Sequence, residues 1–200
     1  MDNTSFANED IEIRAVGRVR VVRFTRPDMR NPLSLGVLDG LYGLLEDLDG
    51  VERLIFTGTD EVFASGANLT EIANVGPEKA REFARHGQVL MSRISELDIE
   101  TIAAINGFCF GGALDLAQAC DRRVASPEDS FAHPGAGLGI ITGWGGTQRL
   151  PRLVGTANAL EMFFTAAPID ADRALHIGLI DSVHPDPLAV ALGDSRDEEI

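Results

Sequence analysis

The residues of this chain best suited to chemistry lie between positions 106 and 121, in the stretch N-G-F-C-F-G-G-A-L-D-L-A-Q-A-C-D. Gly111 and Gly112 allow a backbone to approach a ligand closely. They also open an apolar helix, whose first turn carries unpaired N–H groups and a partial positive charge. Asp115 follows three residues after Gly112 and faces the same point. This arrangement suits the stabilisation of a developing anion beside a single acid.

Alternating strand and helix patterns position this stretch in an α/β fold with a parallel sheet. The apolar run 101–105 predicts a buried strand directly before it, and residues 11–25 predict a hairpin that turns at Gly17. Ser34, Asn68 and Pro77 mark helix starts, with helices expected over 35–48 and 77–97. Further helices are expected from 143, 156 and 170, short strands at 53–58, 122–126 and 180–183, and a glycine-rich loop at 131–139.

The composition is that of a globular domain with a strongly acidic surface. The 200 residues are 44% hydrophobic and 24% charged, and 31 acidic residues against 17 Lys and Arg give a net charge of −14. Such a surface repels nucleic acid and anionic membranes. The polar, acidic N-terminus is unlike a secretory signal, and no apolar run reaches the roughly 18 residues that span a bilayer. We therefore expect a cytoplasmic protein with no nucleic-acid or membrane partner.

The two cysteines, Cys109 and Cys120, indicate neither a metal site nor a disulfide. They form no C-x-x-C pattern and no cluster with histidine, so no bound metal is expected. Both lie in apolar surroundings typical of buried free thiols. Nothing basic stands near Cys109, and we interpret it as a packing residue.

Five stretches together resemble the enoyl-CoA hydratase/isomerase, or crotonase, superfamily over residues 19–183. They are F-T-R-P-D-M-R-N-P-L (24–33), F-T-G-T-D-E-V-F-A-S-G-A-N-L (56–69), the stretch at 106–121, G-W-G-G-T-Q-R-L-P-R-L-V-G (143–155) and A-L-H-I-G-L-I-D-S-V (174–183). The resemblance implies an α/β fold, a crotonase-like spiral of ββα turns, assembled as trimers or hexamers. It implies an acyl-CoA thioester as ligand, with coenzyme A as part of the substrate and no permanently bound cofactor.

The resemblance also assigns roles to particular residues. It implies that the backbone N–H groups of Ser65 and Gly112 form an oxyanion hole for the thioester oxygen. Two donors aimed where charge develops can each contribute about 3 kcal/mol. Coenzyme A and the substrate would lie along Met29, Arg30, Gly66, Ala67, Asn68, Leu69 and Gly111. Arg30 offers a cation for a phosphate, although an exposed loop arginine is an equal alternative.

The sequence departs from the family at the groups that perform hydration. Family hydratases use two glutamates; Asp115 stands at the first of these positions and Gly135 at the second. The family's common G-A-D-L reads G-A-N-L here, with Asn68 in place of the acid. We therefore expect single-carboxylate chemistry by Asp115, either isomerisation or weak hydration, rather than two-glutamate hydration. A helix-capping or salt-bridged acid remains the alternative for Asp115.

Three residues of the expected acyl pocket remain open to other interpretations. His133 could act as an acid or base, but a hydrogen-bonded structural histidine is favoured. Trp144 could line the pocket together with Gly135, or it could be plain core. The G-A-G-L-G at 135–139 is a weak nucleotide-binding pattern, because the surrounding strand, helix and acid of a dinucleotide fingerprint are missing.

The expected domain organisation is a disordered N-terminus over 1–10, one crotonase-like acyl-CoA domain over 11–192, and an acidic tail over 193–200. The helical region that family members carry after the equivalent of Val183 is expected to be shortened. A non-catalytic acyl-CoA-binding protein is the alternative function, since the expected ligand-binding residues are more complete than the catalytic pair of carboxylates.

Overall fold

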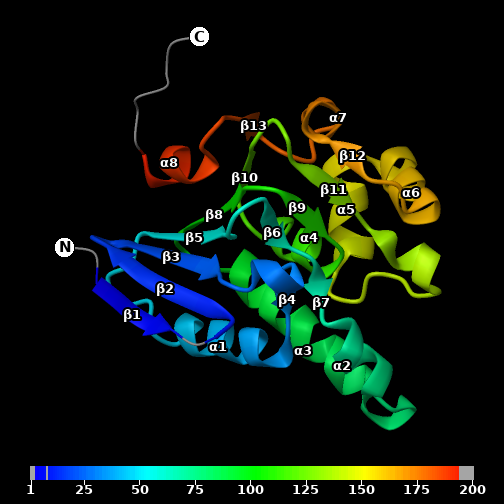
Figure 1. Ribbon diagram of the computed structural model, residues 1–200, viewed down its shortest axis with the longest axis horizontal. Helices are drawn as coiled ribbons and strands as arrows, with labels where there is room; N and C mark the ends of the chain where they lie inside the picture. Colours follow the sequence, from blue (N-terminus) through cyan, green and yellow to red (C-terminus); the bar gives the residue numbers. More distant parts are fainter. Residues whose placement is uncertain (1–2, 8, 194–200) are drawn as a thin grey trace.

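A seven-stranded sheet forms the first layer of the protein, in a computed structural model that describes residues 3–7 and 9–193. Its strand order is β1-β2-β3-β5-β8-β10-β13 (Figure 1). The first two pairs are antiparallel and the rest are parallel, as the alternating strand and helix patterns predict. The strands are β1 (Asn3–Ala7), β2 (Ile11–Val16), β3 (Val19–Phe24), β5 (Arg53–Thr57), β8 (Glu100–Ile105), β10 (Arg122–Ala125) and β13 (Ser182–Val183).

The expectation of a disordered N-terminus over 1–10 is wrong for Asn3–Ala7, which forms β1 at the edge of this sheet. β1 pairs antiparallel with β2, where Asn3 lies opposite Ala15 and Ala7 opposite Glu12. Its polar sequence gives little strand signal, and the exposed edge of β2 supplies the backbone partners that order it. Of the acidic tail expected over 193–200, the structure describes only Gly193.

A second, four-stranded sheet, in the order β12-β11-β9-β6, was not predicted from the sequence. Its strands are β6 (Val62–Ala64), β9 (Phe108–Phe110), β11 (Ser130–Ala132) and β12 (Ile169–Asp170). Strands of two or three residues are too short to show an alternating pattern, so only their tertiary partners define them. A third sheet pairs β4 (Pro32–Leu33) with β7 (Gly66–Ala67), and it joins two of the stretches expected to hold coenzyme A.

The helices follow the predicted starts closely. Ser34 caps α1 by accepting a hydrogen bond from Val37 N–H at 3.2 Å, and Asn68 caps α2. The helices are α1 (Leu35–Leu45), α2 (Leu69–Asn74), α3 (Pro77–Ser95), α4 (Gly112–Ala117), α5 (Gly146–Val154), α6 (Thr156–Thr165), α7 (Ala171–His176) and α8 (Pro187–Leu192), with 3₁₀ turns η1 (Pro27–Met29) and η2 (Pro134–Leu138). The sequence did not predict α8, whose six residues are too few for a helical period.

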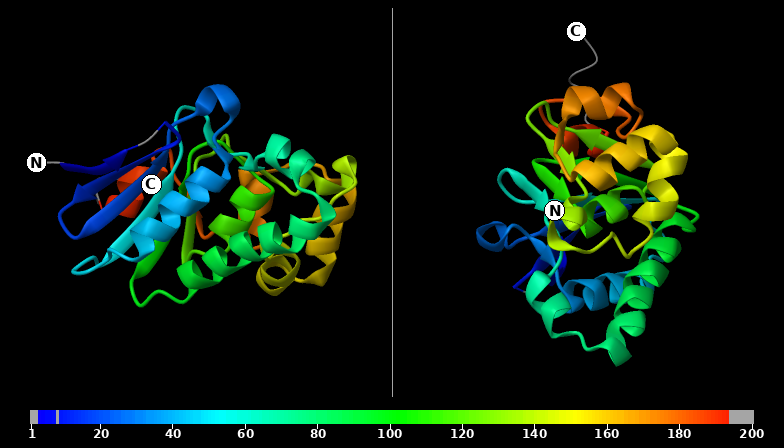
Figure 2. Two further views of the ribbon diagram at one scale, coloured as in Figure 1. Left: turned by 90° about the horizontal axis from the view of Figure 1, so that it is seen from below. Right: turned by 90° about the vertical axis from the view of Figure 1, so that its right-hand side faces the viewer.

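The large sheet carries apolar side chains on both faces. One face packs against α8, through residues that include Val21, Ile55 and Ala191. The other face contributes to the main core together with α1, α3 and α4, through residues that include Leu38 and Leu90. Figure 2 shows α1 and α3 on one side of this sheet and α8 on the other. No helix in the described part of the chain is long and apolar enough to cross a membrane.

The step from β8 in the first sheet to β9 in the second carries the chain to the candidate site. Asn106 fixes this step: its Oδ1 accepts a hydrogen bond from Gly58 N–H at 2.8 Å, and its Nδ2 donates to Asp60 O at 2.7 Å. The chain then passes through β9 and Gly111 into α4. The predicted turn from a buried strand into a helix is therefore confirmed, with β9 inserted between them.

Candidate active site

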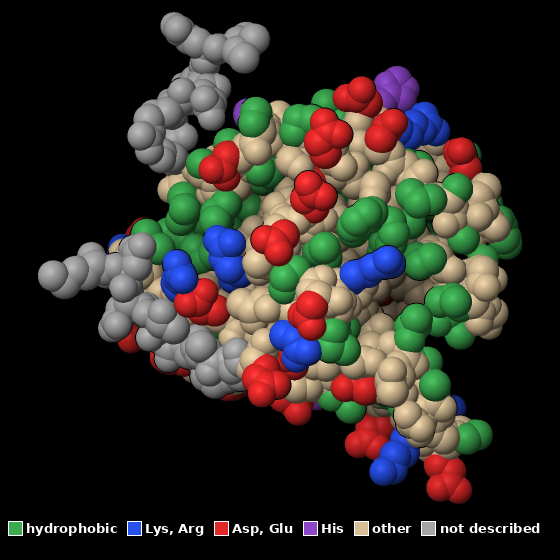
Figure 3. All heavy atoms as spheres, in the orientation of Figure 1, with side chains coloured by type: hydrophobic (Ala, Val, Ile, Leu, Met, Phe, Trp, Pro, Cys, Tyr) green, Lys and Arg blue, Asp and Glu red, His purple; other side chains and the backbone are tan. Residues whose placement is uncertain are grey.

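A mostly apolar cavity of about 590 Å³ lies between α2, α3, α4, η2, the loop before α5, and α6. In the view of Figure 3, apolar side chains gather around a hollow on the side where Figure 1 shows α6. The cavity is lined by Ser65, Ala67, Leu69, Ile72, Val75, Ala80, Phe83, Ala84, Gly111, Gly112, Asp115, His133, Pro134, Gly135, Ala136, Leu138, Ile140, Ile141, Thr142, Gly143, Trp144, Phe163 and Phe164. The size and lining suit a small apolar ligand with few polar contacts.

Asp115 is the carboxylate of this cavity and is completely buried. Its Oδ2 accepts hydrogen bonds from the Thr142 hydroxyl and, at 3.2 Å, from the Trp144 backbone N–H. Its Oδ1 has no hydrogen-bond partner among the described residues. Oδ2 is thus held by two hydrogen bonds, whereas Oδ1 can still accept a hydrogen bond or a proton.

Burial controls the proton affinity of Asp115. It raises the pKa of this carboxyl to about 6, while the hydrogen bonds from Thr142 and Trp144, the positive charge of Arg149 and the backbone N–H of Gly146 act in the opposite direction. A carboxyl with a pKa near the working pH exchanges a proton readily in both directions. The hydrogen bonds to Oδ2 do not support the helix-capping alternative, because Thr142 and Trp144 both precede α5 and neither α4 nor α5 has a side-chain cap.

His133 lies beside Asp115 and is 3% exposed. Its Nε2 is 3.8 Å from Asp115 Oδ1 and 3.3 Å from Gln118 Nε2, and its ring packs 5.2 Å from that of Phe163. Burial lowers the pKa of His133 to about 4, so the imidazole is neutral at neutral pH. The contact with Asp115 is consequently not an ion pair under those conditions.

The start of α5 explains why these two side chains fit together. A Cβ at Gly146, the first residue of α5, would lie 2.2 Å from Asp115 Oδ1 and 3.1 Å from His133 Cε1. Any larger residue at position 146 would enter the space that Asp115 and His133 occupy. The second pair of glycines in the sequence, Gly145 and Gly146, therefore makes room for the acid rather than for a ligand.

The turns that carry Ser65 and Gly112 lie against each other. A Cβ on Gly66 would lie 2.5 Å from Gly112 N and 2.7 Å from Phe110 O, and Gly66 has a φ of +86°, so only glycine suits this position. The Ser65 N–H donates to Asn31 O at a long 3.3 Å. Gly112 is the first residue of α4, where helix N–H groups have no partner within the helix.

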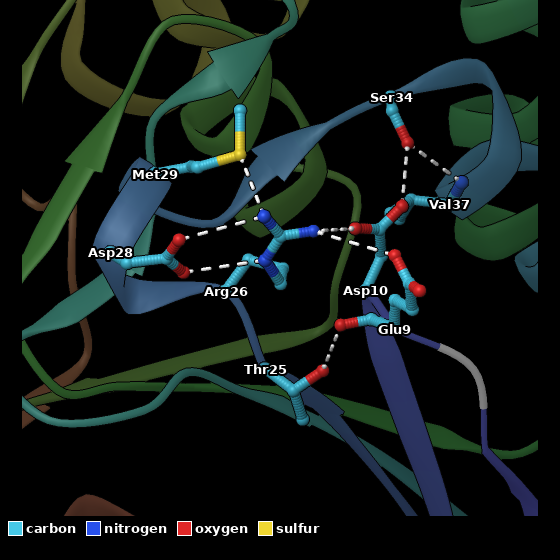
Figure 4. Close-up of polar contacts among 8 residues, drawn as sticks. All are labelled: Glu9, Asp10, Thr25, Arg26, Asp28, Met29, Ser34 and Val37. Carbon is cyan, nitrogen blue, oxygen red and sulfur yellow. Dashed lines mark hydrogen bonds and ion pairs between the residues drawn. The ribbon is translucent and has the colours of Figure 1, made fainter.

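The loop expected to hold coenzyme A is ordered by Arg26 (Figure 4). The Arg26 guanidinium contacts Asp28 at 3.3 Å and Asp10 at 3.5 Å, and it donates to Met29 Sδ at 2.9 Å. Hydrogen bonding to Asp28 raises the pKa of Arg26 and lowers that of Asp28. Arg26 thereby neutralises the acids of this loop and leaves Arg30, the next cation along the loop, in a left-handed turn at its end.

Two departures from the family pattern acquire structural explanations. Asn68 caps α2 through Oδ1, which accepts from Thr70 N–H at 2.9 Å and Glu71 N–H at 3.3 Å. An amide performs this capping as well as an acid does. A Cβ at Gly135 would lie 2.6 Å from Ile140 O, because the loop after η2 folds back onto it. The position of the second glutamate is therefore filled by backbone.

Trp144 is both core and cavity wall. It is 3% exposed, it lies 6.1 Å from the Phe83 ring, and it lines the cavity. A Cβ at Gly87 or at Gly112 would lie within 2.2–2.6 Å of its indole. Trp144 is thus a core residue that also lines the cavity, and its place in an acyl pocket stays a prediction.

The structure brings most of the predicted site residues to one cavity. Those that line it are Ser65, Ala67, Leu69, Gly111, Gly112, Asp115, His133, Gly135 and Trp144, whereas Met29, Arg30, Gly66 and Asn68 lie outside the lining. The sequence missed Thr142, Gln118 and Phe163. Thr142 and Gln118 belong to no motif, and Phe163 reads as an ordinary apolar position in a helix.

Both cysteines are buried and free, as predicted. Burial raises the pKa of Cys109 well above its ordinary value and that of Cys120 to about 12, so neither is a thiolate at neutral pH. Within the described residues no group of His, Cys, Asp or Glu is arranged to hold a metal ion.

Curated proteins similar to this chain are enoyl-CoA hydratases. It is 40% identical over 182 residues to a crotonyl-CoA hydratase of Syntrophomonas wolfei subsp. wolfei, covering 88% of this chain and 70% of that protein. It is 41% identical over 171 residues to a short-chain-enoyl-CoA hydratase of Clostridium acetobutylicum, covering 84% of this chain and 66% of that protein. A probable enoyl-CoA hydratase of Bacillus subtilis is 41% identical over 154 residues, which are 75% of this chain and 60% of that protein. The matched region thus spans only 60–70% of the length of these relatives.

Solved structures give the same result for the fold. DspI of Pseudomonas aeruginosa superposes with a TM-score of 0.87 at 32% identity, covering 96% of this chain and 82% of that one. The enoyl-CoA hydratase of Bacillus anthracis superposes with a TM-score of 0.84 at 33% identity, covering 93% and 73%. These matches confirm the crotonase-like α/β fold. The model of the enoyl-CoA hydratase/isomerase family matches residues 14–192, and the chain belongs to that family.

Proposed function

We propose that this protein binds an acyl-CoA thioester, stabilises its enolate, and moves a proton between two carbons through Asp115. The observation that carries the proposal is the state of Asp115: a completely buried carboxyl in an apolar cavity, with a pKa of about 6 and with Oδ1 unpartnered among the described residues. A group in this state is suited to general acid–base catalysis. The names of the relatives favour a short-chain enoyl-CoA as substrate.

The oxyanion hole in this proposal consists of the backbone N–H groups of Ser65 and Gly112. Its support is the close contact between the two turns at Gly66 and the lining of the cavity by both residues. The thioester oxygen would compete with Asn31 O for the Ser65 N–H, a bond long enough, at 3.3 Å, to be shared. Each donor would stabilise the enolate by about 3 kcal/mol.

Coenzyme A would lie over the loop of Met29 and Arg30 and along the backbone of 66–69. β4 and β7 join these two segments, which supports a single binding surface. Arg30 would supply the positive charge for a phosphate. The family resemblance further implies a homotrimer or a hexamer, which the molar mass in solution tests.

Isomerisation, or weak hydration, is favoured over two-glutamate hydration because Gly135 carries no carboxylate and its Cβ direction points at Ile140 O. Removing a proton from C2 of a 3-enoyl thioester and returning it to C4 requires one proton carrier. Adding water across a 2-enoyl thioester is served best by two. Asp115 alone can therefore serve as the single proton carrier that isomerisation requires.

The test is turnover of matched series of 2-enoyl-CoA and 3-enoyl-CoA substrates by the wild-type protein and by Asp115→Asn. The proposal expects 3-enoyl substrates to be isomerised by the wild type only. Unchanged rates in Asp115→Asn would remove the role of Asp115. Micromolar binding without turnover would favour the alternative function, a non-catalytic acyl-CoA-binding protein, and failure to bind any acyl-CoA would exclude both.

A further inference from the structure

The indole of Trp144 fills the space between α3 and α4. Its five-membered ring lies against Gly87 on α3, where a Cβ would stand 2.2 Å from Cδ1. Its six-membered ring lies against Gly112, the first residue of α4, where a Cβ would stand 2.6 Å from Cε3 and Cζ3. Two glycines, one on each helix, thus form a slot for the indole. A larger side chain at either position would displace it.

Hydrogen bonds hold the backbone of this residue as well. The Trp144 N–H donates to Asp115 Oδ2 at 3.2 Å, and the Trp144 carbonyl accepts from Arg149 at 3.3 Å. The carbonyl of the preceding Gly143 accepts from Gln88 Nε2 on α3 at 2.7 Å. These bonds connect the loop to α3, α4 and α5, so the indole is a fixed wall of the cavity.

The cavity is closed on the side of Trp144 and open on the opposite side. Trp144 is 3% exposed, whereas Leu69, Ile141 and Phe164, which also line the cavity, are 55%, 65% and 78% exposed. An apolar chain gains binding free energy in proportion to the surface that it removes from water. A chain that grows toward the exposed residues gains little, and a chain that grows between α3 and α4 meets the indole.

The indole also lies beside the proposed position of the reacting carbons. Its six-membered ring packs against Gly112, whose N–H is a proposed donor to the thioester oxygen. Its backbone contacts Asp115, the proposed proton carrier. An acyl chain with C1 at Gly112 and its first carbons at Asp115 therefore runs along the indole. Carbons further along the chain have no space between α3 and α4.

We propose that Trp144 determines the length of the acyl chain that this protein accepts, by occupying the space between α3 and α4 that a longer chain would fill. This inference rests on the proposed function, since it places the thioester oxygen at Gly112. Trp144 makes and breaks no bond and acts only on selectivity. Removing the indole opens a space of the order of an apolar cavity of about 150 Å³, which holds a benzene molecule. Several methylene groups fit in such a space.

The test is calorimetric titration of wild type and Trp144→Ala with butyryl-, hexanoyl-, octanoyl- and decanoyl-CoA, which are saturated and report binding alone. Each methylene buried in the new space should lower Kd by about fourfold, equivalent to about 0.8 kcal/mol. The ratio of the Kd of butyryl-CoA to that of octanoyl-CoA should therefore rise by at least about tenfold in Trp144→Ala. A general loss of packing would weaken all four ligands together and would leave this ratio unchanged.

Two further variants complete the test. Trp144→Phe keeps an aromatic ring and should shift the ratio in the same direction by a smaller factor; it decides the matter if Trp144→Ala does not fold. Tyr42→Ala is the matched control, because Tyr42 packs against His86 of α3 outside the cavity, and it should keep the wild-type ratio. The wild-type ratio in folded Trp144 variants, or an equal shift in Tyr42→Ala, would overturn the inference alone. Failure of the wild type to bind any of the four ligands would overturn the proposed function with it.

Discussion

Thr142 and Asp115, 27 residues apart in the chain, are joined by a hydrogen bond in which the threonine hydroxyl donates to Asp115 Oδ2. Thr142 belongs to the loop that folds back from η2, and Asp115 belongs to the first turns of α4. The same oxygen accepts the Trp144 N–H from just before α5. One carboxylate oxygen thus ties the loop to the helix, and the other oxygen remains for chemistry.

Thr142→Val should move the pH dependence of turnover upward. The Thr142 hydrogen bond lowers the pKa of Asp115, so its loss raises that pKa above about 6 and leaves less carboxylate at a given pH. A hydrogen bond to a charged group of about 1.5 kcal/mol corresponds to roughly one pH unit. The midpoint of the acid limb of kcat should rise by that amount, with Thr142→Ser as the control that keeps the hydroxyl. An unshifted acid limb would contradict the role of Thr142.

Asp115 and His133 should have opposite effects on stability as the pH changes. The folded-state pKa of Asp115 is raised to about 6 from an ordinary value of about 3.9, so its contribution is present below about pH 3.9 and is lost as the pH rises through 6. The pKa of His133 is lowered to about 4 from about 6.5, so its contribution is present above pH 6.5 and is lost as the pH falls through 4.

The two effects offset each other in the wild type between about pH 4 and 6, and single variants separate them. Relative to wild type, the free energy of unfolding of Asp115→Asn should rise by roughly 3 kcal/mol over this interval, and that of His133→Gln should fall by a similar amount. Urea unfolding at closely spaced pH values measures both. Curves parallel to that of the wild type would show that neither side chain titrates as described.

The sequence predicted the large sheet apart from β1, most helix starts and the position of Asp115 near the start of a helix, because each leaves a local signal. The caps at Ser34 and Asn68 and the buried run before Asn106 needed no tertiary information. The second sheet and the cluster around Asp115 depend on contacts between distant segments. Gln118 and Thr142 acquire their roles only when η2 and α5 pack beside α4. No spacing in the sequence indicates that these distant segments pack together.

Arg30→Ala should weaken binding of acyl-CoA without changing the chemical step. A cation on a phosphate contributes to the ground state and the transition state alike, so KM should rise by about tenfold or less at low salt, with kcat unchanged. The difference should shrink as salt is added. Arg18→Ala is the control, because Arg18 is exposed and paired with Glu52 elsewhere on the surface. Equal KM values for wild type and Arg30→Ala would remove Arg30 from the binding surface.

Gly135→Glu should not restore two-glutamate hydration. A Cβ at this position meets Ile140 O at 2.6 Å, so the loop after η2 must move before the new carboxylate can reach the cavity. We expect a loss of about 1–3 kcal/mol in the free energy of unfolding and no gain in hydration of a 2-enoyl-CoA. Thermal unfolding and a hydration assay measure the two effects. A hydration rate well above that of the wild type would show that the loop is not a barrier.

The central claim is that this cavity forms an enolate with Asp115 as the proton carrier, and exchange of the C2 protons of a saturated acyl-CoA in D₂O measures it most directly. Butyryl-CoA has no double bond to shift or hydrate, so deuterium at C2 reports enolate formation alone. Binding is followed in parallel by the fluorescence of Trp144, the single tryptophan, which lines the cavity. The account predicts exchange with the wild type and with the exposed control Asp39→Asn, and a loss of at least about a hundredfold with Asp115→Asn. Bound butyryl-CoA that gains no deuterium, or equal exchange by Asp115→Asn, would contradict it.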